Sequence, residues 1–118
     1  MYEYRVKSVE RVVDGDTVDV ILDLGFGLFK KERVRLSGID TPEKRTRNLK
    51  EKKLGYDATA FAEAWFSSDH EKFEDDIIVT TSKDGKYGRM LGDIWCSTTN
   101  INEEMVTRGY AWKYDGGT

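Results

Sequence analysis

Apolar and polar residues alternate along the first part of the chain with the two-residue period of half-buried β-strands. Residues 4–13 are rich in β-forming side chains and end at Asp14-Gly15, which is a turn signal. Apolar side chains then occupy every second position of the next segment: Val18, Val20, Leu22 and Leu24. The intervening positions are mostly polar, so this region predicts a β-hairpin with one face toward solvent.

The next segments predict a third strand and then a helix. Gly25-Phe26-Gly27 indicates a second loop, after which apolar Val34 and Leu36 alternate with polar neighbours. Residues 54–67 show helical spacing, and we expect their apolar stripe to face the core rather than a ligand. The stripe consists of Leu54, Ala58, Phe61, Ala62 and Trp65.

The last third of the chain predicts two more strands and a short helix. Residues 77–81 and 90–95 favour strands, and the turn-like segment 83–88 joins them. Asn100, with a glutamate three positions on, resembles a helix-capping box, and Gly109 is a typical helix stop. Five short strands with two interposed helices predict an α+β fold, mainly β: a five-stranded OB-type barrel with two flanking helices.

Length and composition fit one domain spanning residues 1–118. Its 38% hydrophobic content is enough for a single core. Cys96 is the only cysteine, so no internal disulfide can form. The first residues show no apolar leader and no long hydrophobic span. We therefore expect a cytoplasmic protein without a membrane segment, or a secreted one if a leader was removed.

Charge is distributed unevenly around a net charge of −3, which argues against non-specific coating of nucleic acid. Residues 44–53 hold six Lys or Arg and one Glu, whereas residues 69–76 hold five Asp or Glu and one Lys. We interpret the acidic run as a solvated face. The basic run is either a solvated loop or a contact with the backbone of a polyanion.

Two local patterns bring charged side chains together. Asp16 shares the parity of the apolar positions that follow it, so its carboxylate needs a partner, although a plain turn residue is an equal alternative. The apolar parity shifts at Gly38, as a β-bulge or sharp bend requires. Arg35 and Asp40 then share a face despite their odd separation. A simple ion pair between them is the alternative to a catalytic role.

Oxygen ligands dominate this region. Asp16, Asp40 and the Thr41 carbonyl predict a site for calcium or magnesium, and no Cys/His cluster favours zinc. His70 lies in the acidic run, far from these motifs, so we do not expect it to be catalytic. Glu43, three residues past Asp40 and after Pro42, is the best-placed general base.

Two arginines are candidates for binding a phosphate in its transition state. Arg35 offers a fixed fork of donors, and Arg89 follows a glycine in a turn. Either arginine taken alone is more typical of a solubilising surface residue.

Three blocks in matching order resemble the signature of the staphylococcal nuclease (thermonuclease) family: residues 12–18, 35–43 and 84–92. The resemblance covers roughly residues 5–112. It implies an OB-type barrel, calcium dependence in preference to magnesium, and cleavage of DNA and RNA without sugar specificity.

The resemblance also implies roles for single residues. The metal ligands are Asp16, Asp40 and the Thr41 backbone, the catalytic residues are Arg35, Glu43 and Arg89, and the residues that contact a bound nucleotide are Lys86, Tyr87 and Tyr114. Tyr114 aligns less cleanly than the others. The chain ends about where relatives continue, so we expect it to lack a full third C-terminal helix.

The sequence therefore predicts a monomeric nuclease in which water, activated by Glu43, attacks phosphorus in line and leaves a 3′-phosphate. We expect single strands to be preferred, because a shallow barrel surface contacts backbone and stacked bases. Two alternatives stay open: a catalytically inactive OB-type module that binds nucleic acid or protein, and a structural barrel with ion-paired turns.

Overall fold

The computed structural model describes residues 2–67, 77–81 and 90–114. Its strands are β1 (Tyr2–Asp14), β2 (Thr17–Gly25), β3 (Leu28–Leu36), β4 (Ile39–Asp40), β5 (Ile77–Thr81), β6 (Met90–Cys96), β7 (Thr99–Asn100) and β8 (Trp112–Lys113). Its helices are α1 (Leu49–Ser67) and α3 (Ile101–Thr107). Within the described residues, neither helix has the length and apolar character needed to cross a membrane.

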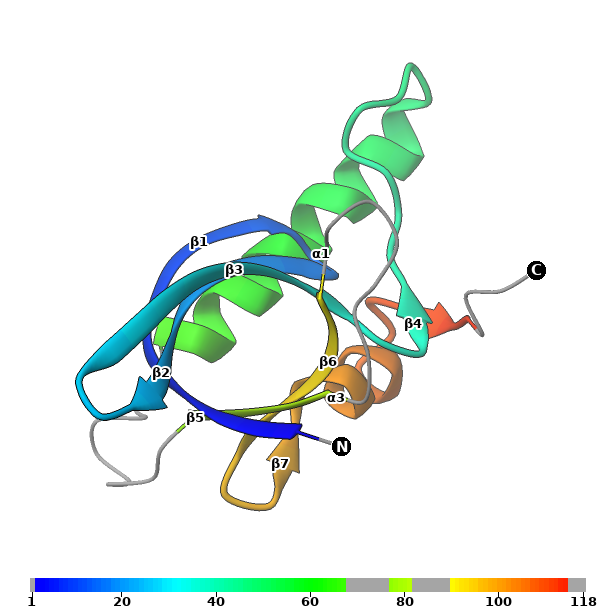
Figure 1. The fold of residues 1–118 in the computed structure, drawn as a ribbon. Helices are drawn as coiled ribbons and strands as arrows, with labels where there is room; N and C mark the ends of the chain where they lie inside the picture. The colour runs from blue at the N-terminus through cyan, green and yellow to red at the C-terminus, as the bar shows by residue number, and fades with distance from the viewer. Residues whose placement is uncertain (1, 68–76, 82–89, 115–118) are drawn as a thin grey trace.

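Five strands close into a ring. The sheet order is β3-β2-β1-β5-β6-β7, and β3 also pairs with β6, in parallel, which joins the two ends. Figure 1 shows the ring with α1 running past it and α3 beside β6. This arrangement confirms the predicted mainly-β barrel with two helices. The short pair β4–β8 lies outside the ring, and the sequence did not predict it.

Side chains of the predicted apolar parity fill the barrel. Val18, Val20 and Leu22 of β2 are all at most 1% exposed, and the core continues with Val34 and Leu36 of β3. Leu24 was also predicted to be buried, but it is 40% exposed. It lies where β2 and β3 extend past the part of β3 that pairs with β6, so no strand covers it.

Helix α1 begins at Leu49, five residues before the predicted start. The Asn48 side chain accepts a hydrogen bond from the Glu51 amide at 3.1 Å, so Asn48 caps the helix. The second half of the basic run is therefore helical. The predicted stripe is wrong at its first member, because Leu54 is 54% exposed.

Gly55 occupies the packing position that the sequence assigned to Leu54. A Cβ atom at Gly55 would lie 2.8 Å from both the Glu43 carbonyl carbon and the Pro42 carbonyl oxygen. One turn further along the helix, Ala58 sits against Gly15, where an added Cβ would lie 2.9 Å from the Ala58 Cβ. Helix α1 therefore touches the backbone of both loops that carry predicted site residues.

The last helix has the predicted ends. The Asn100 side chain accepts from the Glu103 amide at 3.1 Å, and Gly109 has a φ of 82°. The Gly109 amide donates to Val106 O and the Tyr110 amide to Met105 O, which is a Schellman turn. This turn places the Tyr110 ring against Phe61 of α1, with centroids 4.7 Å apart.

Ion pairs cross the outer face of the β1–β2–β3 sheet. Arg33 binds Asp19 through both Nε at 2.8 Å and Nη2 at 3.1 Å, and Arg5 binds Asp23 at 2.8 Å. The hydrogen bond from Arg33 lowers the pKa of the Asp19 carboxyl below its usual 3.8. Both aspartates are thereby neutralised on an otherwise cationic face.

We expect Gly55→Ala to destabilise the fold by about 1–3 kcal/mol, because the new methyl group overlaps the Pro42–Glu43 backbone. Within an unobstructed helix the same change stabilises by roughly 0.5–1 kcal/mol, so the sign of the effect is diagnostic. Urea denaturation measures it, with Ala60→Gly at an exposed position of α1 as the reverse control. A stabilised Gly55→Ala chain would contradict the close approach.

Asp19→Asn should make stability depend less on pH. A carboxyl with a lowered folded pKa stabilises the fold above its unfolded pKa, and this contribution is lost as the pH falls through the folded value. We expect the variant to cost no more than about 1 kcal/mol at neutral pH, since Arg33 is half exposed, and nothing in acid. Urea denaturation at neutral pH and well below about pH 4 tests this. Arg33→Gln should behave alike, and a cost that is equal at both pH values would argue against the pair.

Candidate active site

Arg35 lies at the centre of the predicted site. It stands in β3 opposite Thr17 of β2 and Leu91 of β6, and its side chain is only 14% exposed. Its Nη1 donates to the carbonyls of Leu36 at 2.9 Å and Ile39 at 2.8 Å. These carbonyls flank the turn between β3 and β4, so the guanidinium holds that turn closed.

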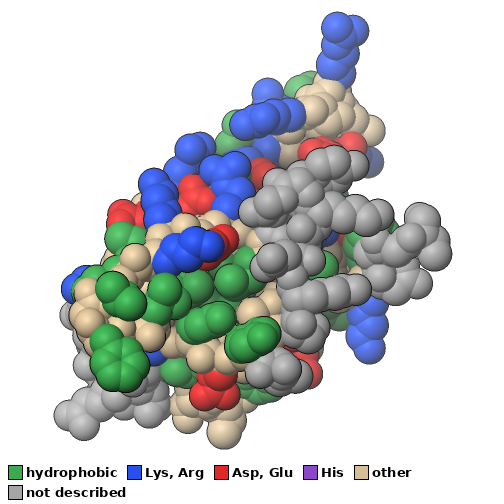
Figure 2. Space-filling view, viewed as in Figure 1, with side chains coloured by type: hydrophobic (Ala, Val, Ile, Leu, Met, Phe, Trp, Pro, Cys, Tyr) green, Lys and Arg blue, Asp and Glu red, His purple; other side chains and the backbone are tan. Residues whose placement is uncertain are grey.

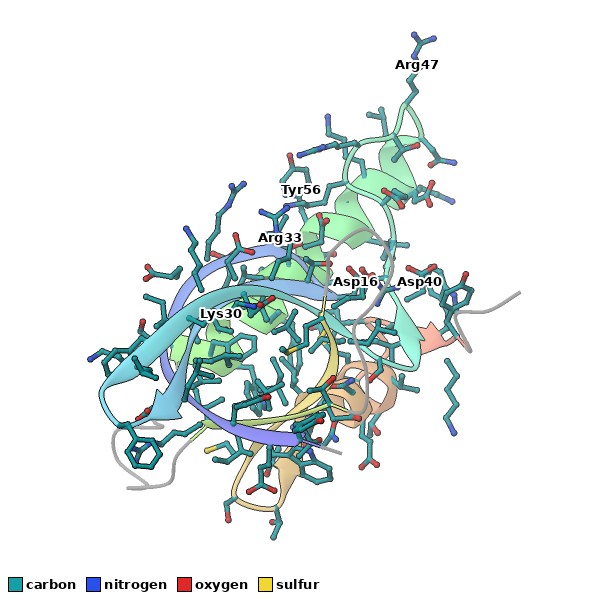
Figure 3. The ribbon with its side chains drawn as sticks, viewed as in Figure 1. Asp16, Lys30, Arg33, Asp40, Arg47 and Tyr56 are labelled. Atoms are coloured by element: carbon teal, nitrogen blue, oxygen red, sulfur yellow. The ribbon has the colours of Figure 1, made fainter. Side chains whose placement is uncertain are left out.

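The other terminal nitrogen of Arg35 faces both predicted acids. Nη2 lies 3.5 Å from Asp16 Oδ2 and 3.5 Å from Asp40 Oδ1. Figure 3 shows Asp16 and Asp40 near each other on one side of the barrel, with Arg33 and Lys30 further along β3. The three side chains that the sequence placed together are therefore together in the fold.

Asp16 combines the two interpretations that the sequence left open. It is a turn residue, because Asp14 pairs with Thr17 and leaves Gly15-Asp16 as the loop. It is also buried, at 8% exposure, and its Oδ1 accepts a bond from the Thr17 hydroxyl at 3.0 Å. The Asp16 carbonyl accepts from the Leu36 amide at 2.8 Å, which fixes the turn beside β3.

Gly38 brings Asp40 to the same face as Arg35. Its φ is 77°, a conformation that favours glycine, and it lies in a turn between the end of β3 and the start of β4. The predicted shift of parity is confirmed, as a sharp turn rather than a bulge inside one strand. Tyr114, just past β8, donates its amide to Gly38 O at 2.8 Å, so the C-terminal segment passes beside this turn.

The Asp40 carboxyl is held in an environment that disfavours its charge. Burial raises its pKa above the usual 3.8, and the nearby Asp16 carboxylate adds to this rise. The Thr41 amide, which donates to Asp40 Oδ1 at 3.0 Å, and Arg35 act in the opposite direction. The two facing carboxylates repel each other when both are charged, and a bound cation would relieve this repulsion.

The carboxylate and carbonyl oxygens of this site are the type of ligand that a hard divalent cation prefers. The Arg35–carboxylate separations of 3.5 Å exceed the roughly 2.7–2.9 Å of a tight charge-assisted bond, so oxygen lone pairs of both acids are incompletely used. Thr41 is buried and follows Asp40 in the chain, and its carbonyl is the third predicted ligand. Across residues 2–67, 77–81 and 90–114, no group of three or more His, Cys, Asp or Glu could hold a metal. Carbonyl and water oxygens would have to complete such a shell.

Glu43 is positioned through its backbone. It follows Pro42, its carbonyl group packs against Gly55 of α1, and its side chain is exposed. No side chain or amide of the described residues donates a hydrogen bond to it. Its role as general base stays a prediction.

Several predicted residues lie outside the described part of the chain. They are Lys86, Tyr87 and Arg89, together with His70 and the turn 83–88. Tyr114 is described, with its side chain 42% exposed. Its backbone contact with Gly38 places it beside the β3–β4 turn, and its contact with a nucleotide stays a prediction.

Two residues near the site were not singled out from the sequence. Trp112 pairs with Asp40 across β4–β8 and is 49% exposed. Lys44 donates to Val13 O at 2.7 Å and lies 3.5 Å from Asp14, which ties the loop after β4 to the β1–β2 hairpin. Lys44 was counted within the basic run, but its amine serves this internal contact. Trp112 lies in a two-residue strand, which gives no periodic signal in the sequence. Its position opposite Asp40 could therefore be recognised only from the fold.

Comparison with known proteins gives a consistent assignment. The family described as staphylococcal nuclease homologue matches residues 33–117. The thermonuclease of Staphylococcus intermedius is 34% identical over 103 residues, covering 87% of this chain and 56% of the relative. The micrococcal nuclease of Shigella flexneri is 31% identical over 121 residues, covering 91% and 57%.

A further relative has a name that does not mention nuclease activity. Protein ParB of Escherichia coli is 34% identical over 117 residues, covering 91% of this chain and 56% of the relative. The chain thus spans little more than half the length of these curated relatives. Because the family match covers most of the chain, including Arg35, Asp40, Thr41 and Glu43, this chain belongs to the staphylococcal nuclease family.

Proposed function

We propose that this chain is a calcium-dependent nuclease that hydrolyses phosphodiester bonds of DNA and RNA. The observation that carries the proposal is the position of one guanidinium, Arg35, against two acids from separate turns, Asp16 and Asp40. Relatives named nucleases support hydrolysis of nucleic acids as the general activity. The choice of calcium, the lack of sugar preference and the products are our proposals.

Asp16, Asp40 and the Thr41 carbonyl would hold the cation. When bound there, a calcium ion would supply positive charge next to the phosphodiester and polarise its oxygens. Calcium is preferred to magnesium because its flexible oxygen shell tolerates a site with two carboxylates and a carbonyl, whereas magnesium demands near-octahedral geometry.

The protein's own side chains would position the phosphate and the water. Arg35 directs Nη2 toward the acids, and its Nε–H has no acceptor among the described residues, so this edge of the fork can bind a phosphate oxygen. Glu43 would take a proton from the attacking water, and the 5′-oxygen would leave, giving a 3′-phosphate. Arg89 is the proposed second phosphate-binding arginine.

Side chains at the edge of the site would contact the nucleotide. Lys86, Tyr87 and Tyr114 are proposed contacts. The solvent-facing ring of Trp112, across from Asp40, offers a further stacking surface. Stacking on such a ring does not discriminate between bases, but it requires a base that is not already stacked in a duplex. Single strands should therefore be preferred. We propose that the chain acts as a monomer.

Cleavage of a labelled single strand should require calcium and Glu43. We expect chelator to abolish cleavage, Glu43→Gln to lower kcat by about 10²-fold or more, and Arg35→Lys to lower it by about 10²–10³-fold because the fork is lost. Arg108→Ala, at the C-cap of α3, where the side chain pairs with Glu104 and not with the site acids, is the matched control for a lost cation. Binding without metal-dependent cleavage would favour the inactive OB-type module, and equal cleavage by all variants would indicate contamination.

Calcium should stabilise the folded chain through Asp40. A ligand that binds only the folded state adds about 2.7 kcal/mol at one hundred times its Kd, which raises the Tm. We expect Asp40→Asn to abolish this rise, whereas Asp57→Asn, which removes an exposed carboxylate on α1, should keep it. Thermal denaturation with and without calcium measures both. An equal rise in the two variants would place the cation elsewhere.

A further inference from the structure

One face of β3 connects the site to the far end of the barrel. Val34 and Leu36 point into the core, so the alternate residues, Arg35, Arg33, Lys31 and Phe29, share the outer face. These four positions cover about 20 Å of strand at roughly 3.3 Å per residue. The line begins at the guanidinium proposed to bind phosphate and ends next to the β2–β3 loop.

Positive charge exceeds negative charge along this face. Cross-strand positions hold Arg5, Arg11, Lys31 and Arg33 against Asp19 and Asp23, and both aspartates are paired with arginines. Lys31 and Arg11 make no ion pair with any described residue. Figure 2 shows lysine and arginine side chains gathered over β1 and β3, continuing toward the start of α1. The unpaired cations match a polyanion better than an uncharged partner.

The β2–β3 loop presents an aromatic side chain at a conformational cost. Gly25 pairs with Leu28, so Phe26-Gly27 is a two-residue loop, and both residues have positive φ, at 57° and 75°. Asn is preferred at the first position of such turns, whereas a bulky side chain there is strained. The Phe26 side chain is fully exposed, so no packing offsets this cost.

Other apolar groups adjoin this aromatic. Phe29 is 48% exposed, and Lys7 lies over its ring with Nζ 4.2 Å from the centroid. Leu24 and Leu28 are 40% and 60% exposed. An aromatic surface beside unpaired cations is the combination that holds single-stranded nucleic acid, where bases stack and phosphates meet charge.

We propose that the outer face of β3 is a track for single-stranded nucleic acid that extends the substrate from the cleavage site to Phe26. Phosphates would pass the Arg33–Asp19 pair and contact Lys31 and Arg11, and a base would stack on Phe26. This inference rests on the proposed function, because it assumes that the bound polymer is the nuclease substrate. The regular spacing from Arg35 favours a strand of nucleic acid over a lipid surface or a protein.

Binding of strands of two lengths tests the track. The Glu43→Gln chain, with calcium, is titrated with a labelled trinucleotide and with a strand of about 12 nucleotides, within the range that OB folds cover. We expect Phe26→Asn to weaken binding of the longer strand by about fivefold or more, and that of the trinucleotide by less. The Tm of the Phe26→Asn chain should not fall, because Asn suits the positive φ at this position. Loss of affinity without loss of stability separates binding from folding.

The cationic part of the track is tested by salt dependence. Lys31→Ala combined with Arg11→Ala should reduce the slope of log K against log salt for the longer strand by about 1.4, because each lost phosphate contact contributes about 0.7. Arg108→Ala, which removes an exposed cation at the C-cap of α3, should leave the slope unchanged.

Two results would overturn the proposal. One is an equal loss of affinity for both strand lengths, or none, in the Phe26→Asn chain. The other is binding to anionic phosphatidylserine vesicles that Phe26→Asn abolishes while its binding of the longer strand persists, which would assign the loop to lipid. Neither result depends on cleavage, so failure of the nuclease activity itself is seen separately in the cleavage assay.

Discussion

The half-buried guanidinium of Arg35 is the group on which the site depends. It donates to two backbone carbonyls on either side of the β3–β4 turn and faces Asp16 and Asp40 with its other nitrogen. Removing it would leave carbonyls and carboxylates without their cation in a region of low exposure, where unsatisfied polar groups are costly. A single side chain therefore holds the fold of the turn and sets the spacing of the acids.

Much of the barrel, and the centre of the site, follows from the sequence because both depend on local periodicity. The two-residue alternation in β2 and β3 identifies the buried side of each strand, and it also places Arg35 on the opposite side. The change of parity at Gly38 then brings Asp40 to Arg35. Glycine at a positive φ is a local signal, so the meeting of these residues could be predicted without knowing what packs around them.

The remaining features depend on contacts between distant segments. Leu54 fits an apolar helical stripe, yet Gly55 faces the loop, because the Pro42–Glu43 backbone comes too close for any side chain. The β4–β8 pair is too short to carry a pattern, so Trp112 could not be placed beside Asp40. Asn48 lies within a charged run and gives little sign that it caps a helix. These outcomes follow from tertiary packing, which overrides local preference.

The closure of the ring has a consequence for how the site moves. Among the described residues, β3 pairs with β6 at three positions, Val34, Arg35 and Leu36, whereas its pairing with β2 continues along the whole hairpin. Because local opening follows weakly connected boundaries, this described seam should separate more often than the long β1–β2 and β2–β3 pairings. Arg35 lies in the middle of it. The arrangement of Arg35 against Asp16 and Asp40 would then exist only while the ring is closed, and a ligand that bound on both sides of the seam would prolong the closed state.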